Sequence, residues 1–130
     1  MKDETRTWLE YAHENLSAAK LLLDHDVFNP CLQNVQQTVE KMLKALLVES
    51  GDKVKRTHSI SELVALLSAK GLSVPLVADE CDLLDSIYLP SKYPLGSALP
   101  DFEPDRVICD RCVGIALRLR HAVEELLTDR

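Results

Sequence analysis

Residues 30–47 read PCLQNVQQTVEKMLKALL, and this stretch has the most regular helical pattern in the chain. Its apolar side chains recur every three or four residues, which places them along one side of an α-helix. Pro30 suits the first turn of a helix and Gly51 suits its end. We therefore predict a long helix with one side in a hydrophobic core. Its apolar positions are Leu32, Val35, Val39, Met42, Leu43, Leu46 and Leu47.

Two further long helices are expected at the ends of the chain. An apolar stripe from about Asp3 to His25 predicts the first of them. Asp105 is a suitable N-cap for the other, whose apolar stripe continues to Leu126. Each stripe needs a partner surface, so we expect the long helices to pack together in one bundle.

Two shorter helices are expected between them. Residues 59–62 read SISE, a capping box that should begin a helix ending before Gly71. Pro75 should begin the next helix, and Pro90 should stop it soon after Tyr88. A long loop would then follow, from Leu89 to Pro104, and loops of this length are often functional. The prediction is an all-α, up-and-down bundle of three long and two short helices.

Composition sets the broad class of the protein. The 130 residues are 46% hydrophobic and 28% charged, which predicts a single globular domain over residues 1–130. No apolar run is long enough to cross a membrane, and the charged N-terminus does not resemble a secretory signal, so we expect a cytoplasmic protein without membrane contact. The net charge of −6 opposes indiscriminate nucleic-acid binding, although a local basic patch can still attract phosphate.

The four cysteines do not form a metal motif. Cys109 and Cys112 have a two-residue spacing, but a structural zinc ion needs four ligands and no second pair follows. Both positions lie on the apolar side of the last helix, so we expect packed thiols, and Cys31 and Cys81 are interpreted in the same way. We predict no metal and no cofactor.

A polar stripe lies beside the apolar stripe of the second predicted helix. Gln33, Gln37, Glu40 and Lys44 stand at i, i+4, i+7 and i+11 and therefore share one side. Either this side is solvated, or it lies in a helix–helix interface where its amides fix the register. These four residues are our candidate interface.

The strongest cluster of positive charge lies between the second and third helices. Lys53, Lys55, Arg56 and His58 could attract phosphate there, or His58 could simply organise the start of the next helix. On the last helix, Arg111, Arg118, His121 and Glu125 share roughly one side, which we interpret as solvated. Paired carboxylates such as Asp82 and Asp85 are also expected to be solvated.

Several of these segments together resemble the HEPN family, named for its higher-eukaryote and prokaryote nucleotide-binding domain. The resemblance rests on residues 33–47, on the N-terminal helix with Trp8 and Ala12, on residues 57–63, and on Tyr88 followed by 92–94, which read KYP. It covers essentially the whole chain. It implies a helical bundle that usually dimerises and often accompanies a separate minimal nucleotidyltransferase.

The resemblance also raises the question of ribonuclease activity. Many HEPN proteins are metal-independent ribonucleases whose last helix holds an arginine and a histidine at a short, fixed spacing. Here Arg118 and Arg120 are too close to His121, and Arg111 is too far from it, so these catalytic roles are not carried over. The family often has Arg-Tyr-Pro where this chain has lysine at position 92, which keeps the charge but loses the planar fork of arginine.

The functional prediction is a noncatalytic HEPN adaptor that binds nucleotide or single-stranded RNA weakly and pairs with a nucleotidyltransferase. Candidate nucleotide- or phosphate-binding residues are Lys55, Arg56, His58, Lys92 and Tyr93. One alternative is a toxin-like ribonuclease with a non-standard site, in which His58 or His121 would transfer protons. The other is a purely structural dimerisation module. A homodimer is expected in each case.

Overall fold

The computed structural model describes residues 1–53, 56–92 and 103–128, and all regular structure in these ranges is helical. Three long helices and two shorter ones are present, as predicted. They are α1 (Asp3–Asp24), α2 (Phe28–Glu49), α3 (Ile60–Ala69), α4 (Ala78–Lys92) and α5 (Arg106–Thr128). None of these helices is both long and apolar enough to cross a membrane.

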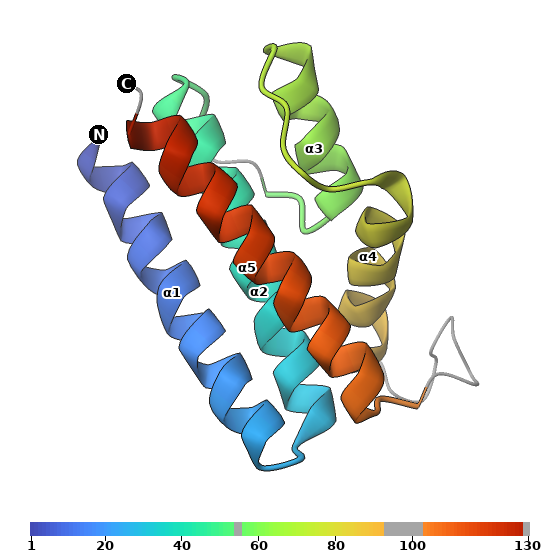
Figure 1. Cartoon of the computed structure of the whole chain (residues 1–130). Helices are drawn as coiled ribbons and strands as arrows, with labels where there is room; N and C mark the ends of the chain where they lie inside the picture. The colour runs from blue at the N-terminus through green and yellow to red at the C-terminus, as the bar shows by residue number, and fades with distance from the viewer. Residues whose placement is uncertain (54–55, 93–102, 129–130) are drawn as a thin grey trace.

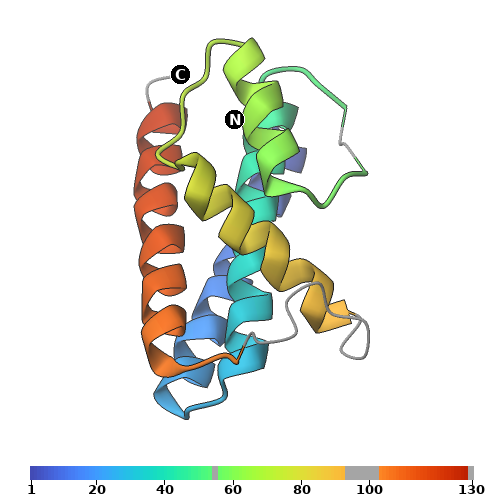
Figure 2. The same ribbon diagram turned by 90° about the vertical axis from the view of Figure 1, so that its right-hand side faces the viewer.

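The helix α2 lies at the centre of the bundle. It packs most extensively along α1, and α3, α4 and α5 also contact it. In Figure 1, α1 and α5 lie side by side with α2 behind them. Figure 2 shows α4 crossing α2 obliquely, with α3 above it. The arrangement gives α2 neighbours on several sides, so its polar residues also meet other helices.

The core follows the predicted apolar stripes. All seven apolar positions predicted on α2 are almost fully buried. Ala12, Leu16 and Ala19 supply the core side of α1, and Leu119 and Val123 that of α5. Close packing of these side chains is the main stabilising contribution in a domain of this size.

Two predicted helix caps are present. The Ser59 hydroxyl accepts a hydrogen bond from the Glu62 amide at 3.2 Å, and the Asp105 carboxylate accepts one from the Ile108 amide at 2.8 Å. In a capping box the Glu62 side chain would also accept a hydrogen bond from the Ser59 amide, but this amide has a different partner. The Ser59 amide donates to the Thr57 hydroxyl at 3.1 Å, which orders the chain just before α3.

The predicted bounds of α4 were wrong at both ends. The helix begins only at Ala78: the Leu76 amide first donates to the Val74 carbonyl at 2.8 Å, and the Val77 amide donates to the Glu80 carboxylate at 3.1 Å. Pro90 lies inside the last turn, where it removes one helical hydrogen bond without ending the helix, which continues to Lys92. Residues 89–92 of the predicted loop thus belong to α4, and residues 93–102 of that prediction lie outside the described residues. Similarly, α2 begins at Phe28, two residues before Pro30.

Candidate functional site

A polar cleft of about 400 Å³ opens where α2, α4 and residues 56–59 meet. One wall is the polar stripe of α2, and the other is formed by His58 and by Tyr88 of α4. The structure therefore brings the stripe and the positively charged turn, which are separate in sequence, to one place. The lining residues are Gln33, Gln36, Gln37, Glu40, Lys41, His58 and Tyr88.

Glu40 is the central residue of the cleft. It is only 8% exposed, and its carboxylate accepts hydrogen bonds from Lys44 Nζ at 3.0 Å and from Gln36 Nε2 at 3.2 Å. Lys44 is 4% exposed and also lies 5.7 Å from the Trp8 ring centroid. A buried carboxylate needs such partners to offset its lost hydration. Glu40 and Lys44, predicted as interface residues, are thus buried within their own chain.

The imidazole of His58 is held in a defined orientation. Its Nδ1 lies 3.1 and 3.2 Å from the two carboxylate oxygens of Glu40, and its ring stacks on Tyr88 with 4.9 Å between centroids and 19° between planes. The side chain is still 50% exposed. Because Glu40 engages Nδ1, a ligand in the cleft would meet the Nε2 edge and the aromatic surface.

The N-terminus of α3, directly beside His58, already carries an anion. The Asp85 carboxylate accepts hydrogen bonds from the Ile60 amide at 2.6 Å, the Ser61 amide at 3.2 Å and the Ser59 hydroxyl at 3.2 Å. The prediction of a solvated Asp85 was therefore wrong. Helix N-termini attract anions, and here the protein supplies its own. This helix N-terminus is therefore already occupied by a side chain of the protein.

Two cations flank the cleft. Arg56 is exposed and lines an adjoining hollow of about 410 Å³, which shares His58 and Tyr88 with the cleft. Lys41 lies on the side of α1, where its Nζ donates to Asn15 Oδ1 at 2.6 Å. The accessible positive charge is therefore at the rim, whereas the Glu40 carboxylate on the floor is already engaged by Gln36, Lys44 and His58.

The predicted site residues are only partly brought together. Arg56 and His58 lie at the cleft, and Lys92 is the last residue of α4. Lys55 and Tyr93 lie outside the described residues. The aromatic residue that meets His58 is Tyr88, four residues before Lys92 and so one turn earlier on the same helix. The four-residue spacing from Lys92 was the sequence signal that could have pointed to Tyr88. For Gln36 and Lys41 the sequence held no signal beyond their positions on α2.

The polar side of α5 was predicted to be solvated, and for Arg118 this prediction was wrong. Arg118 donates from Nε and Nη2 to the Pro75 carbonyl at 3.1 and 2.9 Å, and its Nη2 also binds Glu80. This hydrogen bond lowers the pKa of the Glu80 carboxyl. His121 is 76% exposed and pairs with Glu125 at 3.0 Å. Arg118 thus fastens α5 to the segment before α4, and neither it nor His121 lines the cleft.

The cysteines are packed thiols. All four are buried, and burial raises the pKa of Cys109 to about 12 and that of Cys112 to about 11. Such thiols are poor nucleophiles at neutral pH. Within the described parts of the chain, no three histidine, cysteine, aspartate or glutamate side chains are placed to hold one metal ion.

Comparisons with known proteins identify relatives. The HEPN domain family model matches residues 5–126. The crystal structure of TT1696 from Thermus thermophilus is 27% identical, with a TM-score of 0.64, and the match covers 95% of this chain and 98% of that one. ST0689, described as an archaeal HEPN homologue, is 25% identical with a TM-score of 0.63 and 97% and 98% coverage.

A third structure supports the same fold. The HEPN domain protein tm0613 from Thermotoga maritima has a TM-score of 0.69 at 23% identity, and the match covers 94% of this chain and 98% of that chain. At this identity the likeness concerns the fold alone. No match was found among curated proteins.

Proposed function

Since this chain belongs to the HEPN domain family, we propose that it is a noncatalytic adaptor whose cleft binds a nucleotide or a segment of single-stranded RNA. The observation that carries the proposal is the cleft itself. There the stacked rings of His58 and Tyr88 face a row of glutamine side chains, and Arg56 lies at the rim. Aromatic surfaces, amides and a cation are the groups that bind bases and phosphates in single-stranded nucleic acids.

The charges of the cleft favour one orientation of the ligand. The Glu40 carboxylate on the floor already accepts hydrogen bonds from Gln36 and Lys44 and also contacts His58, so the base edge is left to the amides of the cleft wall. Gln33 and Gln37 offer both donors and acceptors to a base edge. Asp85 occupies the N-terminus of α3, so the phosphate is placed outward, beside Arg56. The base therefore points inward and the phosphate points toward solvent.

Nucleotide binding is tested by titrating AMP and a short fluorescent single-stranded RNA into the protein at several salt concentrations. Tyr88→Leu should weaken binding about tenfold, since stacking of one base contributes about 1 to 3 kcal/mol. Arg56→Gln should weaken binding and reduce the slope of log affinity against log salt by about one, the expected loss for one phosphate contact.

Lys20→Gln is the matched control, because Lys20 is an exposed lysine of α1 that does not line the cleft. It should leave affinity at the wild-type value. Circular dichroism should show wild-type helical content in all three variants. Equal binding by wild type, Tyr88→Leu and Arg56→Gln would refute the cleft as the nucleotide site.

A second candidate function, metal-independent RNA cleavage, is favoured by the Glu40–His58 pair. A carboxylate that holds one imidazole nitrogen leaves the other able to exchange a proton with a substrate, as in general acid–base catalysis. Labelled RNA incubated with the protein in EDTA should stay intact if the adaptor proposal is right. Cleavage that disappears in His58→Ala and persists in His121→Ala would establish the enzyme instead.

The proposed partners are a second copy of the chain and a separate minimal nucleotidyltransferase, as the family resemblance implies. Gln33 and Gln37 are the members of the candidate interface that are not deeply buried. Light scattering at micromolar concentration should give the mass of a dimer. Co-purification with a nucleotidyltransferase expressed from a neighbouring reading frame tests the second partner, and a monomeric protein that captures no such enzyme would contradict both.

A further inference from the structure

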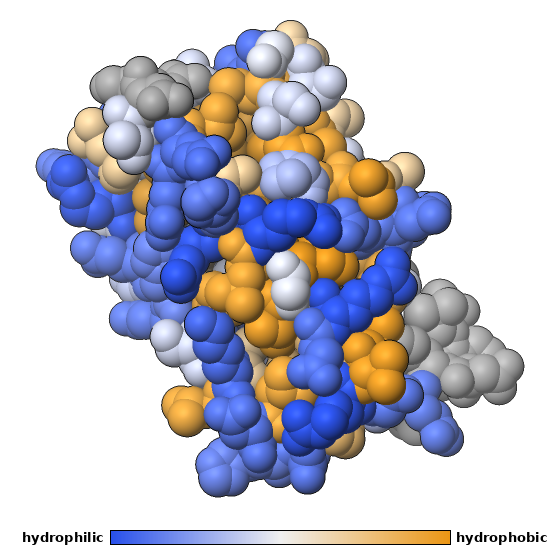
Figure 3. All heavy atoms as spheres, in the orientation of Figure 1, coloured by the Kyte–Doolittle hydropathy of each residue, from blue (hydrophilic) through white to orange (hydrophobic). Residues whose placement is uncertain are grey.

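A second cavity, of about 320 Å³, lies between α1 and α5 and shares no lining residue with the cleft. The helix α1 packs mainly along α2 and less extensively against α5, which leaves this seam incompletely closed. Figure 3 shows hydrophobic residues between the hydrophilic outer surfaces of the two helices. Apolar lining comes from Met1, Leu9, Met42, Val123 and Leu127.

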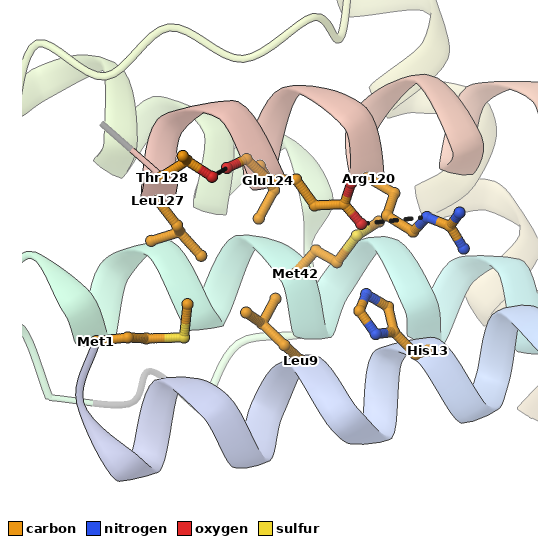
Figure 4. A pocket seen from close by; sticks show the side chains of 9 residues that line it. Met1, Leu9, His13, Met42, Arg120, Glu124, Leu127 and Thr128 are labelled. Atoms are coloured by element: carbon orange, nitrogen blue, oxygen red, sulfur yellow. Dashed lines mark hydrogen bonds and ion pairs between the residues drawn. The ribbon is translucent and has the colours of Figure 1, made fainter. Parts of the chain in front are cut away.

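The cavity has an apolar end and a polar end, where Arg120 is paired with Glu124. In Figure 4, Met1 and Leu127 lie at one end, and His13 of α1 and Arg120 of α5 lie at the other. Glu124 contacts Arg120 at Nε, at 3.6 Å, so this pairing does not use the two Nη nitrogens. The guanidinium therefore keeps hydrogen-bond donors for an anion that enters beside His13.

We propose that this cavity binds a small amphipathic monocarboxylate. Its apolar body would lie over Leu9 and Leu127, and its carboxylate would meet Arg120 and His13. The planar guanidinium matches the two oxygens of a carboxylate. Glu124 lies beside the guanidinium, so a single negative charge is accommodated better than the double charge of a phosphate monoester.

The size of the cavity excludes a bulky occupant. A volume of about 320 Å³ is near the lower end of small-molecule pockets. Met42 and Val123 are 0% and 1% exposed, so the floor of the cavity is closed. A compact ligand fits this shape. The proposal does not depend on the nucleotide cleft, because the two sites have no residue in common.

The methionines provide a direct test, since the chain has only two and both line this cavity. Phenylbutyrate, an aromatic monocarboxylate, is titrated into protein with isotope-labelled methionine methyl groups and followed by NMR. The methyl resonances of Met1 and Met42 should both shift and should saturate together. Phenylbutanol, which has the same apolar body without the charge, should bind about tenfold more weakly.

Variants separate the polar end from the apolar end. Arg120→Gln should weaken phenylbutyrate binding about tenfold and leave phenylbutanol binding unchanged. Arg111→Gln is the matched control, because Arg111 is exposed on the same helix and does not line the cavity. Circular dichroism confirms folding of both variants.

Three results would overturn the proposal. One is equal affinity for phenylbutyrate in wild type and Arg120→Gln, and another is an unshifted Met42 resonance at saturating probe. The third is a fall from dimeric to monomeric mass in Leu9→Lys, measured by light scattering without a probe. That result would identify a second copy of the chain as the occupant of the cavity.

Discussion

Replacing Asp85 by alanine should destabilise the protein, although Asp85 lies on the side of a short helix. Its carboxylate joins α4 to the N-terminus of α3 through two backbone amides and one hydroxyl. Alanine removes all three acceptors. It also removes a negative charge from the positive end of the α3 dipole.

The three lost hydrogen bonds are not equivalent. Ile60 is fully buried, so its amide finds no water partner, whereas Ser61 is exposed and its amide can be rehydrated. The Ser59 hydroxyl can rotate toward another acceptor. The loss is therefore close to that of one strong helix cap plus a dipole interaction, or about 2 kcal/mol in the free energy of unfolding.

Urea unfolding followed by circular dichroism measures this difference. With the m-value usual for a small protein, the midpoint should fall by about 1 M. Asp82→Ala is the matched control, since Asp82 is exposed on the same helix and should change stability by less than about 0.5 kcal/mol. If both variants have the same midpoint, the reasoning about Asp85 is refuted.

Three further outcomes are expected. In native protein at pH 8 the thiols should react with Ellman's reagent only as fast as the protein opens, because burial raises the pKa of Cys109 to about 12; rapid labelling would contradict this. The pKa of Glu80 is lowered from 4.5, mainly by Arg118, so the stabilisation from this pair is present above pH 4.5 and is lost as the pH falls through the lowered value. Arg118→Gln should flatten this acid dependence in urea titrations, and an unchanged slope would exclude the pair as its source. Lys44→Ala should destabilise by about 2 kcal/mol in the same assay, because it leaves the Glu40 carboxylate without its lysine, whereas Lys44→Ala combined with Glu40→Gln should recover part of the loss.

The long helices could be predicted from sequence because their apolar stripes are continuous. Leu32, Val39 and Leu46 recur every seven residues, about two turns of a helix, and all three are buried as expected. Caps made by neighbouring residues were predictable for the same reason. Ser59 and Glu62 are three residues apart, so the geometry of their hydrogen bond is local.

The parts that could not be predicted depend on contacts between distant residues. Asp85 appeared solvated because its partners in α3 are 24 to 26 residues away. Arg118 appeared solvated because its acceptors, the Pro75 carbonyl and Glu80, belong to another segment. Side-chain periodicity on one helix carries no information about which polar groups meet across the bundle.

The candidate site, too, could be predicted from sequence only where it depends on one helix. The polar stripe of α2 was visible in sequence, but its burial was not, because Glu40 and Lys44 are covered by α1 and by the residues around His58. Tyr93, predicted as the base-stacking residue, lies outside the described residues, and the tyrosine that stacks on His58 is Tyr88. The stack of Tyr88 on His58 depends on the packing of α4 against the start of α3, which no pattern within either segment reveals.

The central position of α2 has a consequence for the energetics of recognition. Every amide and carboxylate on the floor of the cleft projects from a helix that the other four helices hold in place. Folding has already fixed the backbone beneath Gln36 and Glu40, so a bound base would not have to order it. The entropy lost on binding is then confined to the ligand and to the exposed side chains, and association should proceed without rearrangement of the floor.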